Sequence, residues 1–299
     1  MDIQKKIKKL ARDKNALILA HNYQNPEIQD IADETGDSLE LARIAAKNSA
    51  DIIVFCGVHF MAESAAILSP QKKVLLPEPA AGCPMADMAE PEDVVELKAR
   101  HPESKVVSYI NTTAAVKAVS DVICTSSNAV KIVEKIDADT VIFVPDKNLA
   151  SWVQRHTSKK IIPWNGFCPT HERFSEEDLA KVRAEHPGVF VMVHPECRPG
   201  VVEKADAVYS TGDMVRFVKS TDLKKIIVGT ETGMIHKLKS AAPGIEYIPA
   251  SPSFVCPNMK KITLQKLYDT LLGENNRVTV DQSTAAKSRA ALDRMLELS

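Results

Sequence analysis

The sequence lacks an excess of either charge, a long apolar segment and any low-complexity stretch. Its 299 residues carry 38 basic and 39 acidic side chains, so we expect neither a nucleic acid nor an anionic membrane as a partner. No apolar run approaches the roughly 18 residues that a membrane-spanning helix needs. The opening residues, MDIQKKIKKLARDKN, lack the apolar centre of a secretion signal and have the spacing of an amphipathic helix. We therefore expect a globular, cytoplasmic protein.

Closely spaced cysteines are also missing. The six cysteines lie at positions 56, 83, 124, 168, 197 and 256, which excludes the zinc-ribbon, thioredoxin-like and radical-enzyme spacings. In a reducing compartment, isolated cysteines are buried apolar residues, catalytic thiols or metal ligands.

Short apolar runs alternate with segments of helical spacing. The runs are continuous, as is typical of strands covered on both faces, and this pattern favours an α/β fold with parallel sheets flanked by helices. The predicted strands are 16–20, 51–56, 73–76, 106–110, 121–124, 141–144, 161–164, 189–193, 207–209, 226–228 and 246–248. Helices are expected at 39–47, after a capping box that begins at Ser175, and at 262–272 and 284–298.

The chain contains an internal repeat of three segments. Each segment begins with a strand that ends in a polar pair, continues with a hydroxyl residue at the start of the next helix, and closes with a Cys-Pro loop. The pairs are His21 with Tyr23, Tyr109 with Asn111, and His194 with Glu196; the hydroxyls are Ser38, Ser126 and Thr211; the cysteines are Cys83, Cys168 and Cys256.

The repeat predicts three αβα domains with parallel sheets, related by a pseudo-threefold axis. We place them at 1–86, 87–171 and 172–257, with the C-terminal helices of 258–299 packing on the first domain. The first segment departs most from the others. Eight residues separate Asp30 from Ser38, whereas five separate Asp121 from Ser126 and Asp206 from Thr211.

Functional groups of open parallel sheets collect at the carboxyl ends of the strands. Three domains around one axis would direct His21, Tyr109 and His194 into a central cavity, on which the three Cys-Pro loops would also converge. Three thiolates without a fourth match a cubane cluster with one iron free of protein ligands, and such an iron is a Lewis acid. Cys56 and Cys124 lack the recurrence and are expected to be packing residues, whereas Cys197 stays open.

The three hydroxyl residues have two interpretations. Serine and threonine at helix starts are ordinary caps, but a helix N-terminus also binds anions. Three such sites around one cavity suit a small substrate with several carboxylate or phosphate groups. His171 is a further candidate because it lies three residues after Cys168.

Over essentially its whole length the sequence resembles the quinolinate synthase family. The matching stretches are AHNYQNPEIQDIAD, GDSLELAR, VSYINTTA, CTSSNA, PDKNLA, WNGFCPTHERF, MVHPEC, YSTGDM, GTETGMIHKL and CPNMKKITLQKLY. The resemblance implies three αβα domains around a 4Fe-4S cluster held by three cysteines. It also implies that iminosuccinate (iminoaspartate) and dihydroxyacetone phosphate condense to quinolinate, phosphate and water, with a second enzyme supplying the iminosuccinate.

Carried over by position, the resemblance implies specific roles for residues of this chain. The cluster ligands would be Cys83, Cys168 and Cys256. The substrate-binding residues would be His21, Ser38, Tyr109, Ile110, Asn111, Ser126, His194, Pro195, Glu196 and Thr211. The catalytic residues would be Tyr23, Glu196, His21, His194 and His171. Many members carry further cysteines in the last motif; here Cys256-Pro-Asn-Met259 offers one thiolate. Pro169 and Thr170, which follow Cys168, occupy a position that we expect to vary.

Two other classes fit the three cysteines. Diphthamide-forming radical enzymes also gather one cysteine from each of three related domains, but they act on a protein and S-adenosylmethionine. A redox sensor or electron carrier would use the cluster without chemistry on a substrate.

Overall fold

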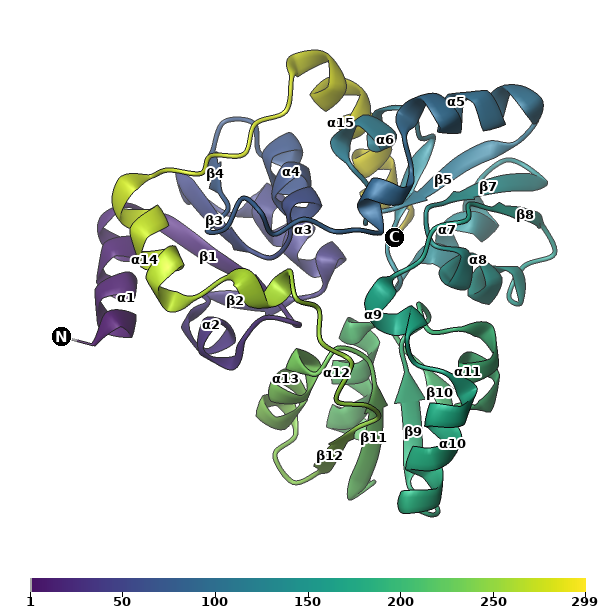
Figure 1. Ribbon diagram of the computed structural model, residues 1–299. Coiled ribbons are helices and arrows are strands. Elements are labelled where there is room, and N and C mark those ends of the chain that lie inside the picture. Colours follow the sequence, from purple (N-terminus) through teal and green to yellow (C-terminus); the bar gives the residue numbers. More distant parts are fainter. Residues whose placement is uncertain (1) are drawn as a thin grey trace.

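Three four-stranded parallel sheets organise the computed structural model, which describes residues 2–299 (Figure 1). The strand orders are β2-β1-β3-β4, β6-β5-β7-β8 and β10-β9-β11-β12, so each sheet repeats one topology. We call each sheet with its helices a unit. This confirms the predicted α/β class with parallel sheets flanked by helices. In Figure 1 the three units surround the middle of the molecule.

The elements follow one another in a similar order in each unit. The first unit comprises α1 (Ile3–Asp13), β1 (Ala16–His21), α2 (Pro26–Ile31), β2 (Glu34–Gly36), α3 (Ser38–Lys47), β3 (Ile52–Cys56), α4 (His59–Leu68) and β4 (Lys73–Leu75). The second comprises η1 (Ala86–Met88), α5 (Pro91–Arg100), β5 (Lys105–Tyr109), α6 (Ala114–Ala118), β6 (Val122–Cys124), α7 (Ala129–Lys135), β7 (Thr140–Val144), α8 (Lys147–Gln154) and β8 (Lys160–Pro163).

The third unit and the C-terminal elements complete the chain. They are α9 (Pro169–Glu172), α10 (Glu176–Glu185), β9 (Phe190–Val193), α11 (Pro199–Lys204), β10 (Ala207–Val208), α12 (Thr211–Ser220), β11 (Lys225–Gly229), α13 (Gly233–Ala241), β12 (Glu246–Pro249), η2 (Met259–Lys261), α14 (Leu264–Gly273) and α15 (Gln282–Leu298). Each predicted strand is present, and the predicted capping box is formed by Ser175 and Asp178 at the start of α10. The strand β2 was not predicted, because Glu34-Thr35-Gly36 is short and polar.

The three units share an aspartate that precedes the edge strand. Its side chain accepts a hydrogen bond from the backbone N–H of the neighbouring central strand. The pairs are Ile18 with Asp33 at 2.8 Å, Val106 with Asp121 at 2.8 Å, and Val191 with Asp206 at 2.7 Å. The alignment of Asp30 with the other two aspartates was therefore wrong. Asp33 is the equivalent residue, and it precedes Ser38 by the same five positions as its counterparts precede Ser126 and Thr211.

Neighbouring units contact each other through equivalent helices. The helix after the first strand of one unit packs on the helix after the third strand of another: α2 on α13, α6 on α4, and α11 on α8. The fourth residue of α2, α6 and α11 is Gln29, Lys117 and Val202, respectively. Gln29 donates across its interface to the Gly233 carbonyl at 2.9 Å, and the buried Lys117 ammonium lies 5.4 Å from the centre of the Phe60 ring. The three interfaces thus repeat in geometry but differ in chemistry.

The two C-terminal helices pack on different units. α14 lies against α1 and β3 of the first unit, whereas α15 lies mainly against α6 and β6 of the second and also touches α4. Between them, Leu75 of β4 pairs antiparallel with Arg277. The end of the chain therefore joins the first two units. None of the helices within residues 2–299 combines the length and apolarity that crossing a bilayer requires.

Replacing Asp206 by alanine removes the acceptor for the Val191 N–H. We expect the free energy of unfolding to fall by about 1–2 kcal/mol, because that N–H loses a charge-assisted hydrogen bond. Asp206→Asn keeps one acceptor oxygen and should cost less. Urea unfolding of both variants measures the difference, and equal stabilities of the alanine variant and the unsubstituted protein would contradict the role of this contact.

Candidate active site

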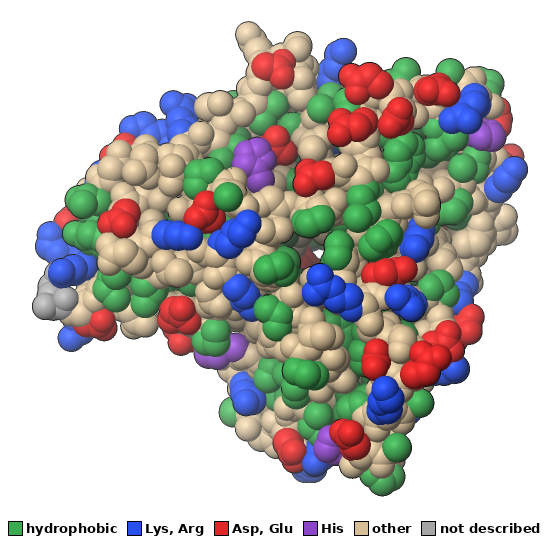
Figure 2. Space-filling view, in the orientation of Figure 1, with side chains coloured by type: hydrophobic (Ala, Val, Ile, Leu, Met, Phe, Trp, Pro, Cys, Tyr) green, Lys and Arg blue, Asp and Glu red, His purple; other side chains and the backbone are tan. Residues whose placement is uncertain are grey.

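The carboxyl ends of the three sheets surround one cavity. His21, Tyr109 and His194, which end or follow the first strand of each unit, all line it, as the repeat predicted. Each lies beside the point where the strand order reverses between the first and third strands of its unit, the usual ligand site of such sheets. Figure 2 shows a small hollow in the middle of one face, with hydrophobic and basic side chains at its edge.

The three Cys-Pro loops reach this cavity by one repeated backbone contact. In each unit, the residue that lies three positions after the end of the third strand donates its backbone N–H. The acceptor is the carbonyl of the residue that lies two positions before the loop cysteine. The pairs are His59 with Ala81, Lys147 with Gly166, and Thr232 with Phe254, each at 2.8 Å. The loops are therefore held by the fold itself, and Cys83, Cys168 and Cys256 all line the cavity.

The donor chemistry of these cysteines fits an iron–sulfur cluster. Each is a free, partly exposed thiol, whereas Cys56, Cys124 and Cys197 are fully buried in the strands and core. Burial raises the pKa of Cys83 to about 12, with the nearby Cys256 adding to the shift. Burial likewise raises the pKa of Cys168, followed by the charges of Glu196 and Cys83. All three thiols face one cavity, and iron is the type of cation that would replace their protons.

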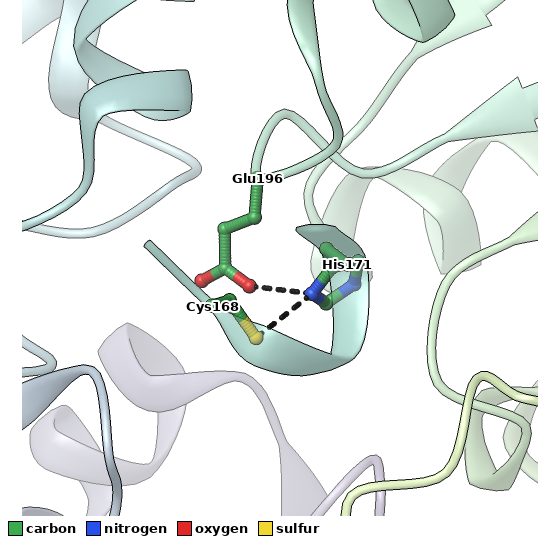
Figure 3. A group of neighbouring side chains, drawn as sticks. All are labelled: Cys168, His171 and Glu196. Atoms are coloured by element: carbon green, nitrogen blue, oxygen red, sulfur yellow. Dashed lines mark hydrogen bonds and ion pairs between the residues drawn. The ribbon is translucent and has the colours of Figure 1, made fainter. Parts of the chain in front are cut away.

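Glu196 is a buried carboxylate with partners from two units. Its Oε1 accepts from the Tyr109 hydroxyl at 2.6 Å, and its Oε2 lies 2.8 Å from His171 Nδ1. Burial would raise the pKa of Glu196, but His194, His171 and these hydrogen bonds lower it to about 2. His171 Nδ1 also lies 3.2 Å from Cys168 Sγ, so the imidazole bridges the thiol and the carboxylate (Figure 3). These three residues would also suit a single metal ion, since their ligand atoms lie within 4.8 Å of one another.

The hydrogen bonds continue from His171 to Tyr23. His171 Nε2 lies 2.8 Å from Thr230 Oγ1, which lies 2.6 Å from the Tyr23 hydroxyl. A chain of hydrogen-bonded side chains thus connects Tyr23 of the first unit to Tyr109 of the second through the third. Such a chain can hold or move protons between its two ends.

His21 and His194 have the same tautomer for the same structural reason. The backbone N–H two residues later donates to Nδ1, from Tyr23 at 3.2 Å and from Glu196 at 3.3 Å. The proton of each neutral ring is therefore on Nε2, which in His194 faces Ser126 Oγ at 3.2 Å. Burial lowers the pKa of His21 to about 3 and that of His194 to about 4. Both rings are neutral near pH 7.

The candidate anion-binding hydroxyls line the cavity but differ in setting. Ser38 and Thr211 are the first residues of α3 and α12, after the capping residues Asp37 and Ser210. Ser126 lies in the turn before α7, so its predicted place at a helix start was wrong. The Asn111 Oδ1 is buried and has no hydrogen-bond partner within the described chain, which leaves an acceptor for a ligand in the cavity.

Two of the predicted substrate-binding residues lie behind the cavity wall. Ile110 is 1% exposed, and its N–H donates to the Cys124 carbonyl at 2.8 Å. Pro195 is buried between His194 and Glu196. Cys197 packs in the core of the third unit, where its thiol lies 3.6 Å from the Gly229 carbonyl.

Several cavity residues were not predicted. Arg173 lines the rim and supplies a positive charge, and Asp37 lines the wall, where burial raises its pKa to about 6. Thr230 links His171 to Tyr23, and Asp146 and Glu231 contact the cysteine loops. Asp146 and Glu231 could have been predicted from the repeat, because both lie two residues after the third strand of their unit. No recurring pattern in the sequence marks Thr230.

Comparisons with known proteins show close relatives over nearly the whole chain. The family model described as "Quinolinate synthetase A protein" matches residues 5–297. The quinolinate synthase of Methanoregula boonei is 52% identical over 296 residues, covering 99% of this chain and 98% of the relative. That of Dehalococcoides mccartyi strain CBDB1 is 53% identical with the same coverage. That of Caldicellulosiruptor saccharolyticus is 52% identical over the full length of both chains.

The neutral buried histidines predict a loss of stability in mild acid. Between the ordinary histidine pKa of about 6.5 and the lowered values, the unfolded chain binds protons that the folded one does not. The free energy of unfolding therefore falls as the pH drops, by about 2 kcal/mol at pH 5 for each of His21 and His194. In urea unfolding of cofactor-free protein at pH 7 and pH 5, His21→Gln and His194→Gln should each reduce this loss by about 2 kcal/mol. The exposed His156→Gln is the control, and an unchanged loss in both site variants would contradict the assignment.

Proposed function

The chain belongs to the quinolinate synthase family, and on that premise we propose that it condenses iminosuccinate with dihydroxyacetone phosphate. The products are quinolinate, inorganic phosphate and two water molecules. The four carbons and the nitrogen of the imine join the three carbons of the triose. These products account for every atom of the two substrates, so the formation of the pyridine ring needs no external oxidant. The observation that carries the proposal is the convergence of three Cys-Pro loops and three polar strand ends on one cavity.

We propose that Cys83, Cys168 and Cys256 hold a 4Fe-4S cluster that has one iron without a protein ligand. When bound, the cluster supplies a Lewis acid for a carboxylate, nitrogen or hydroxyl of the reacting molecule. The support is the donor set, namely three free thiols, one from the Cys-Pro loop of each unit, that line one cavity.

Iminosuccinate carries two carboxylates, and dihydroxyacetone phosphate carries a phosphate. We propose that Ser38, Ser126 and Asn111, which line the cavity, bind the carboxylates of iminosuccinate through their hydroxyl and amide N–H donors. Thr211 at the start of α12 and the His194 Nε2–H would bind the phosphate. Arg173 at the rim adds the positive charge that a dianionic substrate favours.

Ring formation requires several proton transfers. Glu196, ionised at neutral pH, would accept a proton, and the chain through His171 and Thr230 to Tyr23 would return one at the other side of the cavity. His21 and His194 present their Nε2–H groups and would hydrogen-bond developing negative charge. Ile110 and Pro195 would act by shaping the strand ends that place Tyr109 and Glu196.

The surroundings of the reaction follow from its chemistry. An imine hydrolyses in water, which favours a nearby enzyme that supplies iminosuccinate. Reduced thiols favour a cytoplasmic location. The diphthamide-type alternative is disfavoured by the full-length match to quinolinate synthases, and a mere electron carrier would not need the polar groups around the cavity.

The proposal is tested by purifying the protein without oxygen, measuring iron and sulfide, and following quinolinate formation from the two substrates. Cys83→Ala, Cys168→Ala and Cys256→Ala should each abolish turnover and lower iron content. Cys56→Ala and Cys124→Ala, which alter buried strand residues, are matched controls that should keep both. Turnover that requires S-adenosylmethionine, or cluster-loaded protein that makes no quinolinate, would overturn the proposed function.

Glu196→Gln removes the ionised carboxylate but keeps the shape of the side chain. We expect kcat to fall by about 10²–10⁴-fold, because the amide cannot accept the proton, while the iron content stays unchanged. Glu203→Gln, an exposed surface substitution, is the control. Near-normal turnover of Glu196→Gln with an intact cluster would refute the assignment of a proton-transfer role.

A further inference from the structure

Two buried carboxylates lie outside the proton-transfer chain and have no part in the proposed chemistry. Asp146 and Glu231 occupy the same position, two residues after β7 and β11, and both are 0% exposed. A fully buried carboxylate is costly unless its oxygens are satisfied, so their hydrogen bonds indicate what they do.

In each carboxylate, one oxygen accepts a hydrogen bond from the start of a helix and the other accepts one from the backbone of a cysteine. Asp146 Oδ1 accepts from Leu149 N–H at 2.7 Å and caps α8, while Oδ2 accepts from Cys168 N–H at 3.2 Å. Glu231 Oε2 accepts from Gly233 N–H at 2.7 Å in the first turn of α13, while Oε1 accepts from Cys256 N–H at 3.2 Å. Both residues therefore connect a rigid helix start to the backbone of a cysteine on the cavity.

We infer that Asp146 and Glu231 are positioning residues that fix two of the three sulfur ligands for the cluster. The inference rests on the proposed cluster site and goes beyond it, because both residues would act on the cluster through the backbone N–H of a cysteine and not as ligands. Metal affinity depends strongly on such outer contacts, whose loss typically costs about 10–100-fold.

Glu231 has a further partner that links its loop to the first unit. Lys260 Nζ lies 3.0 Å from Glu231 Oε1 and donates to the Tyr23 carbonyl at 2.6 Å. The Cys256 loop is thus tied both to α13 and to the segment that carries Tyr23. Within residues 2–299, Asp146 has no ammonium partner and accepts from backbone N–H groups alone.

The first unit lacks this device, because Val58 stands at the equivalent position. A buried carboxylate at this position therefore binds the backbone N–H of Cys168 and of Cys256, whereas Cys83 has no such partner from the equivalent Val58. A carboxylate offers a separate acceptor oxygen to each of the two N–H groups, whereas an amide of the same shape replaces one of these oxygens with an NH2 donor.

The test compares Asp146→Asn and Glu231→Gln with the unsubstituted protein, all purified and loaded with iron and sulfide without oxygen. The readout is the rate of iron release to a chelator. We expect each variant to release iron about 10-fold faster. Asp121→Asn is the matched control, because Asp121 also accepts a backbone N–H but at the opposite end of β5 from Tyr109.

A conservative variant separates positioning from folding. Glu231→Asp keeps two acceptor oxygens, so it should release iron more slowly than Glu231→Gln. Should Asp146→Asn fail to fold, the comparison of Glu231→Asp with Glu231→Gln still tests the inference. Folded, loaded variants that release iron at the rate of the unsubstituted protein would overturn the inference alone. Unsubstituted protein that takes up no iron and sulfide would instead overturn the proposed cluster on which it rests.

Discussion

Burying the Glu196 carboxylate is the costly step on which the arrangement of the site depends. An isolated charge at 3% exposure would be strongly destabilising. The charge is tolerated because three side chains surround it. These are Tyr109 from the second unit, His171 from α9 and His194 from the unit of Glu196 itself. The carboxylate is satisfied only when the second and third units are docked. The same contact that makes the charge tolerable therefore fixes the relative positions of the units.

Repetition supplies the framework, and divergence supplies the chemistry. The strand order, the aspartate before each edge strand and the backbone contact of each cysteine loop recur in all three units. The side chains at equivalent places differ: His21, Tyr109 and His194 at the strand ends, and Val58, Asp146 and Glu231 after the third strands. A threefold scaffold with identical side chains would present three equal faces to a ligand. The differences make the cavity asymmetric, as the two unlike substrates proposed above would require.

Much of this fold could be predicted from the sequence because its signals are local. Continuous apolar runs identified the strands, and recurrence identified the three loop cysteines and the strand-end residues. The failures have physical causes. The strand β2 is short and polar, so Asp30 was matched in place of Asp33. Ser126 precedes its helix by a turn that composition does not reveal. The chain from Glu196 to Tyr23 runs through Thr230, whose role depends on the docking of the units and has no local signature.

The order of the units along the chain has a consequence for how the molecule is made. The third sulfur, on Cys256, is followed by η2, α14 and α15, and α15 returns to pack against the first two units. A growing polypeptide carries no more than two of the three sulfurs until residue 256 has been added, and its central hollow has an open side until the third unit has been made. The proposed cluster would therefore gain its third ligand late in the synthesis of the chain.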